Sequence, residues 1–187
     1  MKRIVVLLMA LSLGACAGYS RVPSGEVDLG NGMSVQTPIE WSRITAGKHE
    51  MWTRDGNVLQ ELWIAKGLTD GEVLIPPVPG RREELPEYDE SITLLEVADF
   101  IKASMAGQGF QQVELRDVRP RRFGADDGVE AELEFLTEDG LLKQGRFVAI
   151  QQEGKLYVVM YSGVAGHYFE SYRDEAEQVI SSIATDF

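Results

Sequence analysis

The alternation of hydrophobic and polar positions is clearest over residues 129–162, where it predicts three antiparallel strands joined by two tight turns. In the first of these strands, apolar residues from Val129 to Phe135 alternate with three glutamates. Successive side chains of a strand point to opposite faces, so this strand has one buried and one exposed face. The other two strands are apolar on both faces, and we therefore expect helices to cover both sides of the sheet.

Turn length fixes the register of this meander, because a slip of one residue moves every side chain to the other face. A three-residue loop over 138–140, with a glycine at Gly140, keeps one continuous apolar face, whereas a two-residue loop would place Leu133 opposite Arg146. The second turn fits a two-residue loop at Glu153 and Gly154. The predicted pairs are Ala131–Phe147, Val129–Ala149, Glu132–Arg146, Phe147–Met160, Ala149–Val158 and Gln151–Leu156.

Further strands are predicted in the first half of the chain. Asn31-Gly32, a strong hairpin signal, lies between short apolar segments at 27–29 and 33–37. Residues 41–46 are expected to form a strand, and segments 50–53 and 58–65 form a second hairpin around Asp55-Gly56. Three tryptophans recur at equal spacing here, Trp41, Trp52 and Trp63. We interpret them as core residues of successive strands, with an aromatic ligand platform as the alternative.

Two helices are predicted. Thr93 and Glu96 form a capping box at the start of the first, which begins at Leu94 and ends at Gly107 or Gly109. The second covers residues 167–183, where apolar residues recur with the helical period. It is expected to be one continuous amphipathic helix that closes the domain.

Two segments lack clear periodicity. Residues 67–90 contain several prolines and are interpreted as a surface insertion, with docking of the apolar residues 73–75 on the domain or a partner as the alternative. A strand at 111–118 is expected to end in an exposed basic turn, residues 119–122 (RPRR). A contact with phosphate or an acidic partner is the alternative for that turn.

The amino-terminal segment indicates where the protein resides. Lys2 and Arg3 precede an apolar run at 4–13 that is too short to span a bilayer and is typical of a secretory signal. The tetrapeptide at 13–16, Leu-Gly-Ala-Cys, resembles the lipobox of bacterial lipoproteins and contains the only cysteine of the chain. The resemblance implies cleavage before Cys16 and lipidation of that residue; ordinary secretion with a spare cysteine is the alternative. Ala17 occupies the position after the cysteine at which an aspartate, by resemblance to enterobacterial lipoproteins, would signal retention at the inner membrane. The alanine therefore favours attachment to the outer membrane, with the protein facing the periplasm.

Length and charge set further bounds. We expect a lipoprotein signal peptide over 1–15, a flexible tether over 16–26, and a single α+β domain over 27–187 with the proline-rich insertion at 67–90. The precursor has a formal net charge of −12, which argues against nucleic acid as a partner and against a basic mode of membrane binding. Attachment would therefore depend on acyl chains at Cys16.

Candidate chemistry is sparse. The two histidines, His49 and His167, stand alone, and no hydrolase, metalloprotease or phosphate-loop motif occurs in the sequence. We therefore predict no catalytic residue, no cofactor and no metal site. Asp126, Asp127 and Glu130 are the weak alternative for a cation site, although they lack the spacing of a calcium loop.

The order of elements resembles the Mog1/PsbP-like α/β/α sandwich. The residues that carry the resemblance are Trp41 after Thr37-Pro38, the helix from Leu94, the strand from Leu156 that ends in YSG at 161–163, and the tail EQVISSI at 177–183. This resemblance implies an antiparallel sheet flanked by helices. Members of that superfamily are mostly non-catalytic partners of larger assemblies, and some of them are bacterial lipoproteins, so the resemblance also implies a role of this kind.

Three functions are compatible with these features. The leading hypothesis is a lipid-anchored, non-catalytic binding or accessory protein of the bacterial cell envelope, with an envelope protein as its partner. The second is a carrier of a small or lipid-like ligand, which requires an apolar cavity between sheet and helix. The third is an uncharacterised hydrolase that uses two converging carboxylates.

Overall fold

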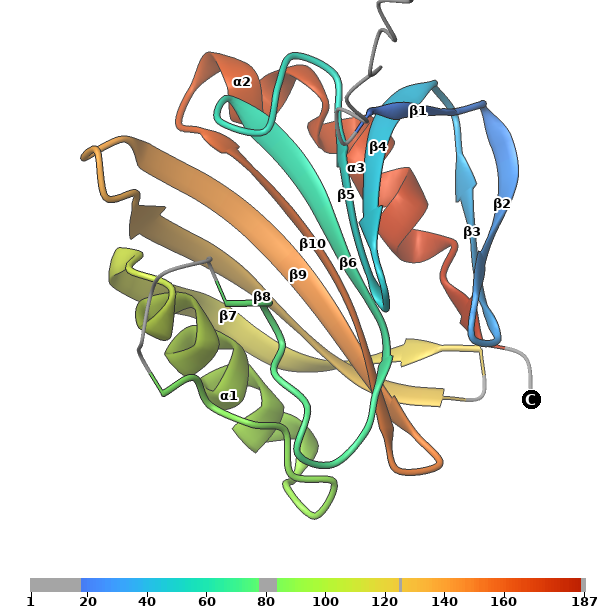
Figure 1. Ribbon diagram of the computed structural model, residues 1–187, viewed down its shortest axis with the longest axis vertical. Helices are drawn as coiled ribbons and strands as arrows, with labels where there is room; N and C mark the ends of the chain where they lie inside the picture. The colour runs from blue at the N-terminus through green and yellow to red at the C-terminus, as the bar shows by residue number, and fades with distance from the viewer. Residues whose placement is uncertain (1–17, 78–83, 125, 186–187) are drawn as a thin grey trace, which may run out of the picture.

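The computed structural model describes residues 18–77, 84–124 and 126–185, and its main feature is an eight-stranded antiparallel sheet (Figure 1). In spatial order its strands are β1 (Ser20–Val22), β4 (Trp41–Ala46), β5 (His49–Thr53), β6 (Gln60–Leu68), β10 (Lys155–Val164), β9 (Leu142–Gln152), β8 (Asp126–Leu136) and β7 (Gln111–Phe123). A small sheet contains β11 (Ala184–Thr185), β3 (Met33–Thr37) and β2 (Gly25–Gly30). The helices are α1 (Leu94–Gly107), α2 (His167–Ser171) and α3 (Arg173–Ser181).

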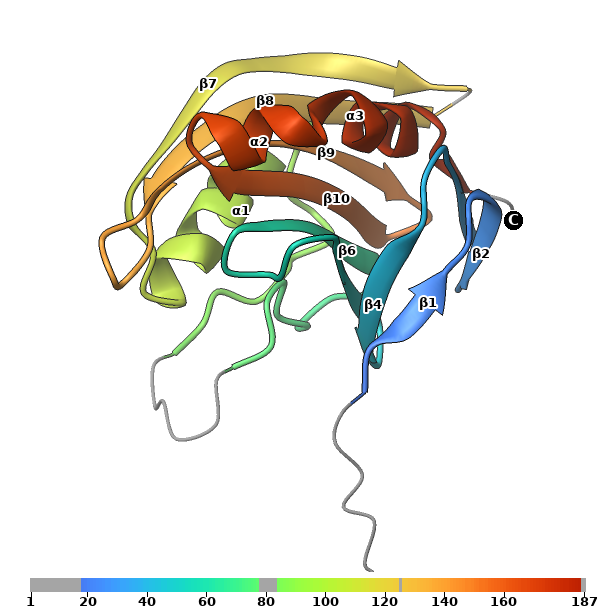
Figure 2. The same cartoon turned by 90° about the horizontal axis from the view of Figure 1, so that it is seen from above.

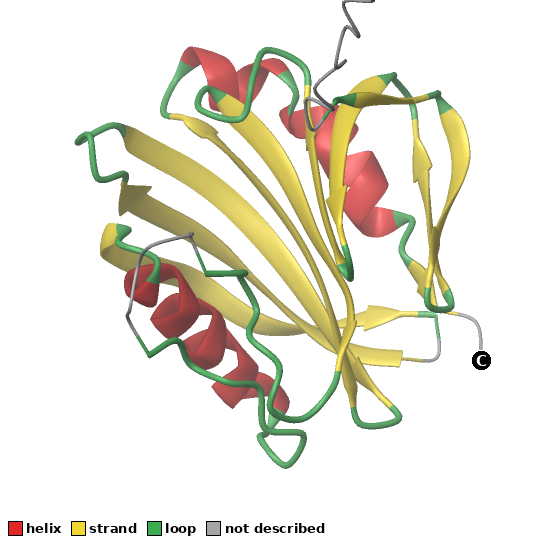
Figure 3. Ribbon diagram, viewed as in Figure 1, coloured by secondary structure: helices red, strands yellow, loops and turns green. Residues whose placement is uncertain are grey.

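The central strands are covered on both faces, as their two-sided apolar pattern predicts. Seen from above, α1 lies against one face of the large sheet and α2 and α3 lie over the other (Figure 2). Figure 3 distinguishes these helices from the strands that they cover. One core cluster contains Phe147, Ala149, Val158, Met160, Val97, Ile101 and Met105. The other contains Val148, Ile150, Tyr157, Val159, Val179 and Ile180 together with side chains of the small sheet.

The predicted register of the meander is confirmed. Ala131 pairs with Phe147 across β8 and β9, and Phe147 pairs with Met160 across β9 and β10. The pairs Val129–Ala149, Glu132–Arg146, Ala149–Val158 and Gln151–Leu156 are also as predicted. Glu153 and Gly154 both have positive φ, 51° and 73°, which is the geometry of a two-residue hairpin turn whose twist matches that of its strands.

The first predicted helix is confirmed, but the second is not continuous. Thr93 accepts from the Glu96 amide, and Glu96 accepts from Thr93, so the capping box is present at the start of α1. The closing segment breaks at Tyr172, whose φ of −131° is outside the helical range, and this residue separates α2 from α3. Tyr172 packs on Trp41, with 6.1 Å between ring centroids. The break lets this side chain contact the core.

The expectation of a flexible tether over residues 16–26 is wrong for most of that range. Val22 pairs with Trp41 of β4 and is 1% exposed, and β2 begins at Gly25. The side chain of Val22 belongs to a core cluster, and its burial favours order in this segment. Cys16 and the predicted signal peptide at 1–15 lie outside the described residues.

The interpretation of residues 67–90 as a surface insertion is wrong for their described parts, and the docking alternative is correct. Leu74 is 0% exposed and Tyr88 is 1% exposed, and both belong to the core cluster that contains α1. The Tyr88 amide donates to the Glu72 carbonyl at 2.8 Å, and Gln151 donates to the Tyr88 hydroxyl at 3.0 Å. The segment thus supplies part of the cover on the α1 face.

The predicted basic turn at residues 119–122 is also wrong, because β7 continues through these residues to Phe123. Pro120 cannot donate a ladder hydrogen bond, but β7 is an edge strand and tolerates it. Positive φ values of 51° at Gln112 and Asp117 mark irregularities in the pairing of this strand with β8. The arginines of this segment therefore lie on the sheet. None of the helices in the described part of the chain is long and apolar enough to span a membrane.

Candidate functional site

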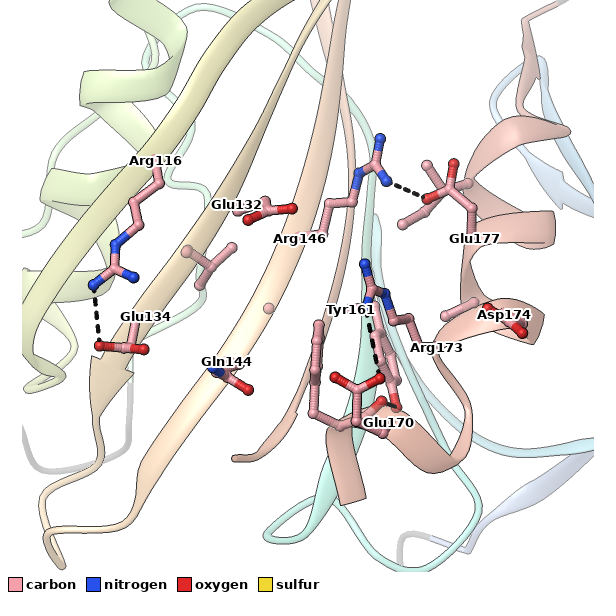
Figure 4. A pocket seen from close by; sticks show the side chains of 15 residues that line it. Arg116, Glu132, Glu134, Gln144, Arg146, Tyr161, Glu170, Arg173, Asp174 and Glu177 are labelled. Atoms are coloured by element: carbon pink, nitrogen blue, oxygen red, sulfur yellow. Dashed lines mark hydrogen bonds and ion pairs between the residues drawn. The ribbon is translucent and has the colours of Figure 1, made fainter. Parts of the chain in front are cut away.

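A charged cleft of about 380 Å³ lies between the exposed face of strands β7–β9 and the helices α2 and α3 (Figure 4). The sheet contributes Arg116, Glu132, Glu134, Gln144 and Arg146, and the helices contribute Glu170, Arg173, Asp174 and Glu177. Tyr161 and Phe169 form part of an apolar floor together with Ala176 and Ile180. The cleft thus combines an apolar floor with charged walls.

The floor is held by contacts between β10 and α2. Tyr161 stacks on Phe169 with 5.6 Å between ring centroids, and its hydroxyl donates to the Phe169 carbonyl at 2.9 Å. Gly163 permits this close packing, because a Cβ atom there would lie 2.8 Å from the Phe169 nitrogen. Burial raises the pKa of Tyr161, so its hydroxyl stays protonated and acts as a hydrogen-bond donor.

Glu130 lies beside the cleft, on the same face of β8 as Glu132, and binds three arginines. It is 5% exposed and accepts from Arg119 at 2.6 Å, from Arg121 at 2.7 Å and from Arg146 at 2.6 Å. Burial alone would raise the pKa of Glu130, but the arginine hydrogen bonds outweigh it and lower the pKa from 4.5 to about 2. Arg121 and Arg146 also bind Glu177 of α3, at 3.2 Å and 2.9 Å. This cluster fixes α3 to the sheet and sets the width of the cleft.

The sequence did not predict this cluster. Glu132 and Arg146 are cross-strand neighbours as expected, but Arg146 forms its ion pairs with Glu130 and Glu177. A signal for the cluster was present: Arg119 and Arg121 lie two residues apart, and such residues share one face of a strand.

The alternative of a cation site at Asp126, Asp127 and Glu130 is wrong. Asp126 accepts from Gln152 and Thr185, Asp127 binds Arg122, and the Glu130 carboxylate is occupied by arginines. Over residues 18–77, 84–124 and 126–185, no group of three or more His, Cys, Asp or Glu side chains could hold a metal ion.

Two carboxylates of the cleft are available for a partner. Glu132 on β8 and Asp174 on α3 make no side-chain hydrogen bond or ion pair with another described residue, and both are exposed on opposite walls (Figure 4). By contrast, Glu134 binds Arg116 at 3.4 Å. Three arginines and five carboxylates line the cleft, so the formal charge of its lining is negative. Such a site is complementary to a basic group that carries apolar neighbours.

The two histidines do not line this cleft. His167 is the first residue of α2, and His49 lies on the other face of the sheet, 5.4 Å from Trp63 between ring centroids. Because Glu130 stays ionised, it cannot serve as a proton donor near neutral pH. Ion pairs between the sheet and α3 fix the walls of the charged cleft.

An apolar groove of about 410 Å³ lies on the opposite face, between strands β4–β6 and the carboxyl end of α1. Its apolar lining consists of Ile44, Ala46, Met51, Trp63, Ile75, Pro76, Met105, Phe110, Phe135 and Met160. Trp41 and Trp52 are buried core residues as predicted, whereas Trp63 is only partly buried and lines this groove. The groove provides the apolar cavity that a ligand carrier requires, and a bound ligand stays a prediction.

No family model and no curated protein sequence matches the chain. Among solved structures, cyanobacterial PsbP (CyanoP) from Synechocystis is similar, with a TM-score of 0.57 and 16% identity over 95% of this chain and 98% of that one. A Bacteroides thetaiotaomicron protein has a TM-score of 0.52 and 11% identity over 89% of this chain and 50% of its own. LpqN, involved in cell envelope biogenesis of Mycobacterium tuberculosis, has a TM-score of 0.41 and 7% identity over 90% and 92%. That TM-score is too low to establish a common fold.

The comparison with CyanoP confirms the predicted fold class. The chain has the PsbP-like α+β sandwich fold, with an antiparallel sheet between helices. At 16% identity the similarity shows the fold alone.

Proposed function

We propose that the protein is a lipid-anchored, non-catalytic binding protein of the bacterial cell envelope that holds another envelope protein in its charged cleft. The observation that carries this proposal is the pair of carboxylates Glu132 and Asp174, which make no side-chain hydrogen bond or ion pair with another described residue and line the same cleft as Tyr161 and Phe169. Because the surrounding ion pairs already fix the walls, binding would require little rearrangement of the cleft.

The chemistry of the cleft defines the partner segment. A lysine or arginine of the partner would lie between Glu132 and Asp174, and an adjacent apolar side chain would cover Phe169. Charge-assisted hydrogen bonds to carboxylates are stronger than neutral ones. The net charge, −12 for the precursor and more negative once Lys2 and Arg3 leave with the signal peptide, would also speed the approach of a basic partner at low salt.

The proposed location depends on Cys16. Acyl chains on this residue would hold the domain at a bilayer, and Ala17 favours the outer membrane with the domain in the periplasm. Each buried methylene contributes about 0.8 kcal/mol, so two or three acyl chains suffice for stable attachment. Labelling of cells with a fatty-acid analogue tests this step: the wild type should incorporate the label and Cys16→Ala should not. An unlabelled wild-type protein would contradict the proposed location.

The cleft is tested by crosslinking in intact cells followed by affinity capture of this protein. The wild type should recover a stoichiometric partner, and the double variant Glu132→Gln/Asp174→Asn should recover at least about tenfold less, which corresponds to 1.4 kcal/mol of binding free energy. Glu26→Gln/Asp99→Asn is the matched control, because it removes the same charge at exposed positions outside the cleft. Equal recovery by the cleft variant and the control would refute the assignment of the cleft.

A further inference from the structure

We infer that the apolar groove shelters one acyl chain attached to Cys16 of the same molecule, so that the protein withdraws part of its own anchor from the bilayer. This inference rests on the proposed function, because the acyl chain exists only where Cys16 is lipidated. It adds a ligand to the face of the sheet opposite the charged cleft.

The groove wall suits a flexible hydrocarbon chain. Met51, Met105 and Met160 are unbranched and adapt their shape to an apolar ligand, and Phe110 packs against Phe135 at 5.0 Å between ring centroids to form a rigid end. The volume of about 410 Å³ lies within the range of about 300–1,000 Å³ that is typical of small-molecule sites.

The polar groups of the groove favour an acyl chain without a charged head. Its lining contains Glu50 and Glu61 but neither lysine nor arginine among the described residues. The nearby Lys143 is already bound to Glu61 at 3.3 Å and to the Asn57 carbonyl at 3.1 Å. Burial lowers the pKa of His49, so this ring is uncharged at neutral pH. A fatty-acid carboxylate or an anionic lipid headgroup would thus lack a cation, whereas the acyl chains of a lipidated cysteine have uncharged amide and ester linkages.

Strand pairing directs the start of the domain toward the groove. Ser20 of β1 pairs with Arg43 of β4, and the next residue along β4, Ile44, lines the groove, as does Ala46. Because β1 and β4 are antiparallel, the direction from Val22 back to Ser20 along β1 leads toward these two residues of β4. Cys16 precedes Ser20 by four residues, which span at most about 14 Å when extended. An acyl chain on Cys16 can therefore reach the groove of its own molecule.

The experiment uses the full lipidated protein, labelled in cells with a diazirine fatty acid, purified into phosphatidylcholine nanodiscs and irradiated. We expect crosslinks from the Cys16 acyl chain to peptides that contain Trp63 or Met160. Ala46→Phe should reduce their yield at least about tenfold, because a phenyl ring at this exposed lining position fills the groove. Thr45→Phe is the matched control, since this exposed neighbour points to the other face of β4. Thermal unfolding of both variants checks that they fold.

The possible outcomes separate this inference from the proposed function. Label at Cys16 with crosslinks only to nanodisc lipid overturns the inference alone, and so do equal crosslink yields from the two variants. Absence of label at Cys16 overturns the proposed lipid anchor and the inference together. In a second arm, unlabelled lipidated protein is irradiated in nanodiscs that contain diazirine phosphatidylcholine. Groove peptides labelled in this arm but not by the Cys16 acyl chain would assign the groove to a bilayer lipid and overturn the inference.

Discussion

Replacing Glu130 with glutamine tests whether one carboxylate holds together the arginine cluster beside the charged cleft. Arg119, Arg121 and Arg146 all donate to this side chain, which is 5% exposed. Their hydrogen bonds outweigh the opposing effect of burial and lower the pKa from 4.5 to about 2. At 1.36 kcal/mol per pKa unit, this shift corresponds to about 3 kcal/mol of folding free energy at neutral pH.

The pH dependence has a defined sign. The pKa of Glu130 in the folded protein, about 2, lies below the value of 4.5 expected in the unfolded chain. The stabilisation is therefore fully present above pH 4.5 and is lost as the pH falls through about 2. Glutamine has no titratable charge, so Glu130→Gln should be less stable than the wild type by about 3 kcal/mol at pH 7, and this difference should shrink by more than half at pH 3.

Urea unfolding followed by circular dichroism at pH 7, 4.5 and 3 measures these differences. Glu132→Gln is the control, since this neighbour on β8 is exposed and forms no ion pair with another described residue, and it should change the free energy of unfolding by less than about 0.5 kcal/mol. A cost below about 1 kcal/mol for Glu130→Gln at pH 7, or a cost that is the same at pH 3, would refute the assigned role of the cluster.

Three further predictions concern the rest of the fold. Leu74→Ala should reduce the free energy of unfolding by about 3 kcal/mol because Leu74 is 0% exposed, whereas Leu95→Ala, at a 58% exposed position, should change it by less than about 0.5 kcal/mol in the same urea assay. Lys66→Met should cost about 3 kcal/mol, since it removes the cation at 2.9 Å from the buried Glu50 and leaves that carboxylate the Trp52 indole at 2.8 Å and Arg43 at 3.6 Å. A double-mutant cycle with Glu50→Gln should recover part of that loss, and strictly additive costs would count against a coupled pair. Burial lowers the pKa of His49 below 6.5, so as the pH falls the unfolded chain binds a proton at His49 at a higher pH than the folded protein does. The free energy of unfolding should therefore decrease as the pH drops from 7 to 5, and it should decrease less in His49→Gln. An identical pH dependence of the two proteins would argue against this assignment.

The central meander could be predicted from the sequence because two independent constraints agree there. The two-residue alternation of β8 fixes which side chains share a face, and the glycines at Gly140 and Gly154 fix the turn lengths, so only one register remains. The start of α1 was predictable for a similar reason, since the capping box between Thr93 and Glu96 is a local interaction.

The remaining features depend on contacts between distant segments. From the sequence alone, the proline at position 120 favoured a turn. However, β7 is an edge strand, so the backbone N–H that Pro120 lacks is not needed for pairing with a further strand. Leu74 and Tyr88 lie in a segment without periodicity, and only the space beside α1 determines that they are buried. The charged cleft combines residues of β7, β8, β9, β10, α2 and α3, so local patterns could identify its charges but not their arrangement.

The alternation of the central strands also determines how the two candidate sites relate to each other. On β10, Met160 lines the apolar groove and the adjacent Tyr161 lines the charged cleft, because neighbouring residues of a strand point to opposite faces. The sites therefore share a backbone but no side chain, and substitutions such as Ala46→Phe and Glu132→Gln alter one site without filling or discharging the other. Loss of partner recovery in Glu132→Gln/Asp174→Asn but not in Ala46→Phe would place partner binding in the cleft alone. Loss in both would require that the partner also covers the β4 edge, since Ala46 makes no contribution to the lining of the cleft.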